Sequence, residues 1–185
     1  MKKIVLFLIF IIFLSGCSLF NPNDFVLPND IEFINTVNEL NTPEKICNYM
    51  KKNFIYEPYV IYLTDPYVIY SPDPYTLWKI KKGLCIDFAA FGVFVADYHG
   101  YETYQIKIYF KNSFSKHFIA IYKENGKYNY SSNMNYYLIN ASTFKEVVEN
   151  YFSYPIIVNG ILYKYELDYY EIYDYNMNIV EQVIK

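Results

Sequence analysis

Two residues of this 185-residue sequence could act together as a nucleophile and a base. Cys85 follows Gly83-Leu84 and opens an apolar run that continues to Tyr98, which is typical of a helix buried in a protein core. A cysteine at a helix start lies among unpaired backbone N–H groups at the positive end of the helix dipole. That environment favours the thiolate, the nucleophilic form of cysteine. Asp87, in the first turn, most simply caps those N–H groups.

Only two histidines are present, so the choice of a base is narrow. His99 falls at the opposite end of the expected helix, about 20 Å from Cys85 by helix geometry, and is too distant. His117 remains, and it opens a β-rich run that continues to Lys123. An imidazole that takes the thiol proton becomes a cation and stabilises the thiolate. We therefore expect Cys85 and His117 to act as a pair.

The strand that begins at His117 is expected to pair with two others. Asn125-Gly126 separates residues 117–123 from residues 128–132, and Asn-Gly between two such runs is the strongest short hairpin signal. Residues 104–110 have the composition of a neighbouring strand. An antiparallel sheet packed against a buried helix predicts a fold of the α+β class.

Further helix signals lie on both sides of this core. Thr42-Pro43-Glu44 has the pattern of a helix start, and Cys47 falls on the apolar face of that helix, where a small thiol packs as core. Residues 143–150 form a short amphipathic pattern, with Ser142 as the expected cap. The residues after it alternate as strands do, to extend or cover the sheet, and show no evident chemistry.

This order of elements resembles the transglutaminase-like family of papain-type cysteine enzymes. The resemblance covers about residues 42–133 and depends on Gly-Leu-Cys-Ile-Asp-Phe-Ala at 83–89, similar to the family's Gly-x-Cys-x-Asp-x-Ala, and on His-Phe-Ile at 117–119. It implies a papain-like fold in which the cysteine helix packs on an antiparallel sheet. It also implies acyl transfer or hydrolysis at a peptide or carboxamide bond, through a thioacyl intermediate. Cys85 would be the nucleophile and His117 the base.

A third family residue, Asp or Asn, orients the histidine, and here the chain departs from the pattern. The family expects an acid on the strand after Tyr128, where this sequence has Ser132 followed by Asn133. Strand alternation puts Ser132 on the face of His117, whereas the Asn133 amide oxygen is the better acceptor and strand ends often bulge. We choose Asn133 as the third catalytic residue. Because neither side chain is charged, a non-catalytic copy of the fold stays open.

The N-terminus has the pattern of an export signal. Met1-Lys2-Lys3 is positively charged, and residues 4–13 are apolar but too short for a permanent membrane helix, which needs roughly 20 residues. Leu-Ser-Gly-Cys at 14–17 resembles the lipobox of bacterial lipoproteins, which implies cleavage before Cys17 and lipid on that cysteine. The alternative is an ordinary signal peptide with a coincidental cysteine.

Three segments follow from these patterns: a signal peptide at 1–16, the lipidated Cys17 with a tether at 17–41, and a transglutaminase-like domain at 42–185. Several acyl chains on one cysteine would hold the protein durably on a cell membrane or an outer membrane. The expected partners are therefore that membrane and a peptide or protein substrate, cell-wall peptide included.

Composition excludes other classes of partner. The net charge of −3 gives no basic field for nucleic acid. Neither metal-ligand spacing nor a glycine-rich phosphate loop occurs, so we expect no metal and no cofactor. The 24 tyrosines suit binding grooves. They support a second hypothesis, a non-catalytic envelope lipoprotein that holds peptide or glycan in a tyrosine-rich groove.

Overall fold

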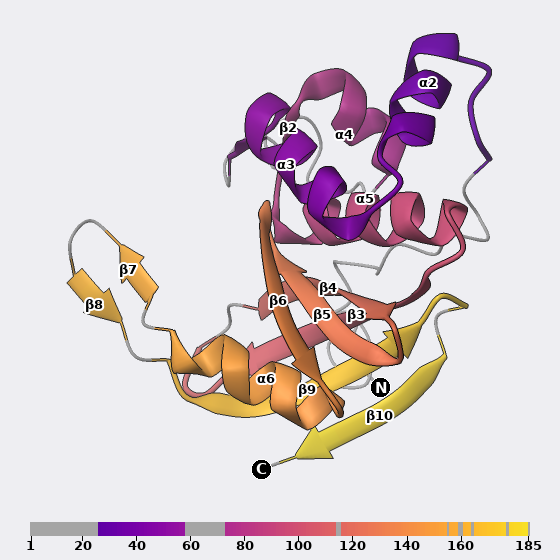
Figure 1. Ribbon diagram of the computed structural model, residues 1–185. Coiled ribbons are helices and arrows are strands. Elements are labelled where there is room, and N and C mark those ends of the chain that lie inside the picture. Colours follow the sequence, from indigo (N-terminus) through magenta and orange to yellow (C-terminus); the bar gives the residue numbers. More distant parts are fainter. Residues whose placement is uncertain are drawn as a thin grey trace, which may run out of the picture.

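The structure is a computed structural model that describes residues 26–57, 73–113, 116–154, 156–158, 161–163, 165–176 and 178–184 (Figure 1). The expected signal peptide and Cys17 lie outside the described residues. Among the helices that are described, none is long and apolar enough to cross a membrane.

Six antiparallel strands form the main sheet, in the order β10-β9-β3-β4-β5-β6. Their bounds are β3 (Glu102–Phe110), β4 (Lys116–Glu124), β5 (Lys127–Ser132), β6 (Asn135–Ala141), β9 (Leu167–Asp174) and β10 (Ile179–Ile184). Two short pairs accompany it: β1 (Ile55–Tyr56) with β2 (Lys82–Gly83), which is parallel, and β7 (Ile156–Val158) with β8 (Ile161–Tyr163), which is antiparallel. The three expected strands are confirmed as β3, β4 and β5, and β9 extends the sheet beside β3.

The helices that the structure describes are α2 (Ile31–Glu39), α3 (Pro43–Asn53), α4 (Pro74–Ile80), α5 (Cys85–Tyr98) and α6 (Phe144–Ser153). The antiparallel sheet and these helices make the fold α+β, as the sequence predicts. Thr42 caps α3 as expected, because its hydroxyl accepts the Lys45 N–H at 3.3 Å. The cap of α6 is Thr143, one residue after the expected Ser142.

Helix α2 corrects the predicted domain boundary. The Asp30 carboxylate caps it by accepting the N–H groups of Glu32 and Phe33, and Phe33 and Val37 are fully buried. A helix whose apolar side chains belong to the core is part of the folded domain. The domain therefore begins before Ile31 rather than at Thr42, and residues 31–39 are not tether.

The two faces of the sheet are covered by different helices (Figure 1). Side chains alternate along β4, so Phe118, Ala120 and Tyr122 pack in the cluster that contains α5, while Ile119 and Ile121 pack in the cluster that contains α6. Helix α5 is buried from residue 86 to residue 96, as its apolar sequence predicts. The sheet thus separates an α5 side from an α6 side.

The β4–β5 hairpin confirms the Asn-Gly prediction. Glu124 and Lys127 are register partners, and Asn125 and Gly126 form the turn with φ angles of 52° and 74°. Two consecutive positive φ angles define the turn that matches strand twist, and asparagine and glycine adopt them at least cost. This turn fixes which residues of β5 lie beside those of β4.

Candidate active site

Cys85 is the first residue of α5, as the sequence predicts, and the residues around it explain the motif. The backbone N–H of Leu84 donates to the Asp87 carboxylate at 2.7 Å, which confirms Asp87 as a capping residue. A Cβ atom at Gly83 would lie 2.8 Å from Leu77 Cδ1 and 2.9 Å from Asp87 Cβ. Only glycine fits so close an approach, so Gly83, Cys85 and Asp87 form one compact helix start.

The Asp87 carboxyl is buried, with 3% of the residue exposed. Burial raises its pKa from the ordinary 3.8 to about 6, although hydrogen bonds from the backbone N–H groups of Leu84 and Asp87 oppose that shift. The charged form of the Asp87 carboxyl is therefore destabilised by burial. The hydrogen bond from the Leu84 N–H accounts for the position of Asp87 at the helix start.

Strand β1 holds the segment that leads into Cys85. Tyr56 pairs with Gly83 in the short parallel ladder, and the Tyr56 ring lies 6.3 Å from the Phe88 ring of α5. Tyr56 is 43% exposed, so its ring covers the start of α5 while reaching solvent. The approach to Cys85 is consequently bordered by an exposed aromatic side chain.

His117 is the second residue of β4, and its hydrogen-bond partner is Ser132, the last residue of β5. The His117 Nε2 and Ser132 Oγ atoms are 2.9 Å apart. Ser132 lies opposite Ile119 in the register, two residues from His117, so the two side chains share a face. The expectation that Asn133 bonds the ring is not met, because the pairing of β5 with β4 continues to Ser132 without a register shift.

Asn133 lies in the turn between β5 and β6, with a φ angle of 52°. Asparagine tolerates this left-handed conformation better than most residues, which accounts for its place there. Its side-chain oxygen is buried and has no hydrogen-bond partner among the described residues. Asn133 thus follows Ser132 in the chain but takes no part in the hydrogen bond between Ser132 and His117.

The imidazole of His117 is neutral at physiological pH. Burial lowers its pKa from 6.5 to about 4, because removing water penalises the charged ring. The sequence pattern led us to expect a cation paired with a thiolate. Ser132 carries no charge that could offset the desolvation, and that is the physical reason for the difference.

Tyr151 of α6 is a site residue that the sequence did not reveal. Its ring stacks on the His117 ring, with centroids 5.4 Å apart and planes 18° apart. Burial raises the pKa of Tyr151, and the charge of the neighbouring Cys85 thiolate raises it further. Tyr151 therefore stacks on His117 and lies within the electrostatic range of Cys85.

A signal for Tyr151 was nevertheless present in the sequence. Apolar residues recur at helical spacing in α6 and pack on the sheet. They are Phe144, Val147, Val148, Tyr151 and Phe152. This stripe predicts which face of α6 is buried, but it does not predict that Tyr151 meets His117.

A pocket of about 390 Å³ adjoins this region. Phe152 and Tyr165 form part of its wall; the Phe152 ring lies 5.2 Å from the Tyr151 ring, and Tyr165 contributes to the raised pKa of Tyr151. The remaining lining residues are Lys111, Val148, Glu149, Glu166 and Leu167. The lining of this pocket therefore combines apolar and charged side chains.

The other two residues considered from the sequence have structural roles. Cys47 is 1% exposed and burial raises its pKa to about 12, which confirms it as core. His99 follows the last turn of α5, and its Nε2 lies 2.8 Å from the Val37 carbonyl oxygen, so it joins α5 to α2. In the part of the chain that is described, no three His, Cys, Asp or Glu side chains gather as a metal site would require.

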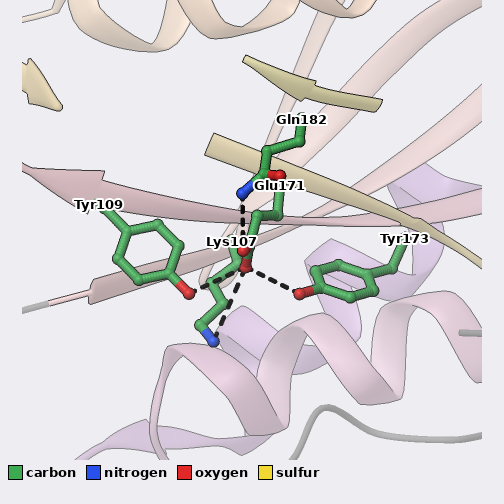
Figure 2. A network of polar contacts seen from close by, with 5 residues as sticks. All are labelled: Lys107, Tyr109, Glu171, Tyr173 and Gln182. Atoms are coloured by element: carbon green, nitrogen blue, oxygen red, sulfur yellow. Dashed lines mark hydrogen bonds and ion pairs between the residues drawn. The ribbon is translucent and has the colours of Figure 1, made fainter. Parts of the chain in front are cut away.

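A separate polar network lies on β3, β9 and β10 (Figure 2). Glu171 accepts hydrogen bonds from the hydroxyls of Tyr109 and Tyr173 at 2.9 and 2.8 Å, and from the Gln182 amide at 3.3 Å. Lys107 Nζ is 3.9 Å from the same carboxylate. Because the carboxylate is paired with a cation and hydrogen-bonded, we assign this network to joining the three strands.

A family model described as a transglutaminase-like domain matches residues 29–163. The match covers most of the chain and includes Cys85, His117, Ser132 and Tyr151. It also begins before α2, in agreement with the corrected domain boundary. The chain therefore belongs to the transglutaminase-like domain family. No curated protein was found to match it.

Proposed function

We propose that this protein is a cysteine enzyme that transfers or hydrolyses the acyl group of a peptide or carboxamide through a thioacyl intermediate. The observation that carries the proposal is the grouping around Tyr151, which is stacked on His117 and lies in the electrostatic range of Cys85. A papain-like arrangement would bring these residues together in the same way, with the cysteine helix on one side of an antiparallel sheet. Family membership supports the same chemistry.

The hydrogen bond to Ser132 suits His117 to the role of base. If Nε2 carries the proton and donates it to Ser132 Oγ, Nδ1 is left with a lone pair. Nδ1 then accepts the proton of the Cys85 thiol, and the thiolate formed in this way stabilises the imidazolium, because the two titrations are coupled. The thiolate sulfur next attacks the carbonyl carbon, and the carbonyl oxygen takes the negative charge. Backbone N–H groups in the first turn of α5 are the natural donors to the oxyanion.

The rest of the cycle returns each proton. The imidazolium gives its proton to the departing amine as the C–N bond breaks, which leaves the acyl group on Cys85. Water or a second amine then attacks the thioester carbonyl, His117 takes its proton, and the C–S bond breaks. The acyl group leaves as an acid or an amide, and the His117 imidazolium returns its proton to the Cys85 sulfur, which restores the thiol and the neutral imidazole.

We further propose that the protein is exported and anchored by lipid on Cys17, where it meets peptide or protein substrates of the cell envelope. The lipobox pattern at residues 14–17 supports this location. Labelling cells with a fatty-acid analogue should mark the wild-type protein and leave Cys17→Ser unmarked. Equal labelling of the two proteins would contradict the anchor.

The enzyme proposal is tested by trapping the intermediate. Purified protein is incubated with a mixture of peptide carboxamides, quenched in acid and digested, and the peptide that contains Cys85 is weighed by mass spectrometry. An added acyl mass is expected in wild type and not in Cys85→Ser. If no acyl mass appears and Cys85 also alkylates no faster than a cysteine in an unfolded peptide, the protein is a binding module of the same fold.

A further inference from the structure

Helix α6 presents Tyr151 to the sheet by simple helical spacing. Val147 and Val148 are fully buried against the sheet, and Tyr151 and Phe152 follow each of them by one turn. The helix is held by this apolar stripe, and its Thr143 cap fixes where the stripe starts. Tyr151 therefore has a defined position at the end of the sheet, where β4 begins and β5 ends.

The His117 ring is restrained at two places. Ser132 holds one edge through the 2.9 Å hydrogen bond to Nε2, and Tyr151 covers one face through the nearly parallel stack. A single hydrogen bond at one nitrogen leaves an imidazole able to rotate about its outer side-chain torsion, because that torsion is broad. A flat ring against its face blocks that rotation.

Tyr151 also separates the His117 ring from water. The desolvation that lowers the histidine pKa requires a cover on the ring, and Tyr151 is the aromatic side chain stacked there. Its own raised pKa keeps the hydroxyl protonated, so it adds no negative charge beside the imidazole. Its contribution to the site is thus shape and exclusion of water.

We propose that Tyr151 is a positioning residue of this site: its ring holds the His117 imidazole in the orientation that bonds Ser132 and directs Nδ1 to Cys85. The proposal deepens the proposed function and rests on it for its role in acyl transfer. Tyr151 itself neither gives nor takes a proton, so its ring is required and its hydroxyl is not.

The test reads the imidazole directly. The full chain is prepared in detergent micelles with ¹⁵N-labelled histidine, and ring nitrogen shifts are followed by NMR between pH 3 and pH 8. The chain has two histidines, so His99 serves as an internal reference. The variants are Tyr151→Phe, which keeps the ring, and Tyr151→Leu, which removes it. Tyr154→Leu, at a residue that is 53% exposed beside α6, is the matched control.

In wild type, His117 should titrate near pH 4 as the Nε2-protonated tautomer, and contacts between the Tyr151 and His117 rings should appear in NOE spectra. Tyr151→Phe and Tyr154→Leu should preserve both properties. Tyr151→Leu should raise the His117 midpoint by about one unit or more and mix the tautomers, because water reaches the ring. Iodoacetamide should also alkylate Cys85 about tenfold more slowly in Tyr151→Leu, as expected when a general base is misplaced.

Absence of the ring contacts in wild type would overturn the proposal even if Tyr151→Leu failed to fold. So would a Tyr151→Leu protein whose His117 keeps the wild-type tautomer and midpoint. A different outcome identifies failure of the proposed function alone: the tautomer responds to Tyr151→Leu, but His117→Ala leaves Cys85 alkylation unchanged.

Discussion

Cys47 and Cys85 have similar kinds of polar neighbours, but we expect their thiols to differ in reactivity. Cys47, on α3, lies near Tyr122 and Ser131 on the α5 side of the sheet. Cys85, at the start of α5, lies near a tyrosine of α6, with a histidine and a serine beside that tyrosine. Each site therefore has a thiol, a tyrosine and a serine.

The two serines are consecutive residues of β5, and alternation sends them to opposite faces. The Ser131 hydroxyl lies 2.8 Å from the Tyr122 hydroxyl, in a place so tight that a side chain on Gly92 would overlap that tyrosine. Ser132 instead bonds His117 at the end of the sheet. What separates a structural thiol from a candidate nucleophile here is a histidine, a helix start and partial exposure.

The largest expected effect is the difference in thiol reactivity between the two sites. At pH 7, iodoacetamide should modify Cys85 on the order of a thousandfold faster than Cys47, because Cys47 reacts only when the core opens. Mass spectrometry of digests taken over time measures both rates in one sample. In 8 M urea the two rates should converge. Comparable rates in the native protein would remove the distinction between the sites.

A second difference is that the Cys85 site contains groups that titrate at mildly acidic pH. His117 has a lowered pKa, so its contribution to stability is complete above pH 6.5 and is lost as pH falls through about 4. Asp87 has a raised pKa, so its contribution is complete below pH 3.8 and is lost as pH rises through about 6. Each pKa shift corresponds to about 3 kcal/mol of unfolding free energy. Between pH 4 and pH 6.5 the two contributions change in opposite directions, so the unfolding free energy of the wild type should stay nearly constant.

Asp87→Asn removes the opposing contribution of the carboxyl, so only the contribution of His117 remains. The free energy of unfolding of this variant should therefore rise by about 3 kcal/mol between pH 4 and pH 6.5. Urea titrations at half-unit steps of pH measure this slope. Asn can still accept the Leu84 N–H, so the helix start is retained. A slope in Asp87→Asn no steeper than in wild type would show that the two groups do not oppose each other.

His117→Ala tests whether the histidine activates Cys85 and leaves Cys47 unaffected. Loss of a general base should slow Cys85 alkylation at pH 7 by about a hundredfold, which is the lower end of the usual range for such catalysis. The Cys47 rate should not change while the fold is intact. His99→Ala is the matched control, and it should leave the Cys85 rate as it is in wild type, because His99 bonds the Val37 carbonyl instead.

The smallest expected effects come from the neighbouring serines, and they should be of different kinds. Ser132→Ala should slow Cys85 alkylation about threefold and also cost about 1 kcal/mol of unfolding free energy, since it leaves the His117 Nε2 atom without its partner. Ser131→Ala should cost about 1 kcal/mol of unfolding free energy and leave the rate alone, because it leaves the buried Tyr122 hydroxyl without that partner.

Asn133→Ala completes this series. Its side chain makes no hydrogen bond to His117, so the rate should change less than in Ser132→Ala. A larger loss of alkylation rate in Asn133→Ala than in Ser132→Ala would favour Asn133 as the residue that orients His117.

Local sequence determined the parts of this protein that depend on near neighbours in the chain. The start of α5 at Cys85, the Asp87 cap, the Thr42 cap and the Asn125-Gly126 turn were all predictable, because caps and tight turns are decided within four or five residues. The face of β4 on which His117 lies also follows, since alternation from a fixed turn leaves no freedom. The candidate pair of Cys85 and His117 came from the same local patterns.

Tertiary structure alone decided what surrounds that pair. The choice between Ser132 and Asn133 depended on whether β5 stays regular to its end, and the stack of Tyr151 on His117 depended on how α6 docks more than thirty residues away in sequence. Helix α2 is part of the core because its two buried side chains, Phe33 and Val37, pack against residues of other helices. The neutral state of His117 is a consequence of burial, and burial is a property of the packed fold that no local pattern contains.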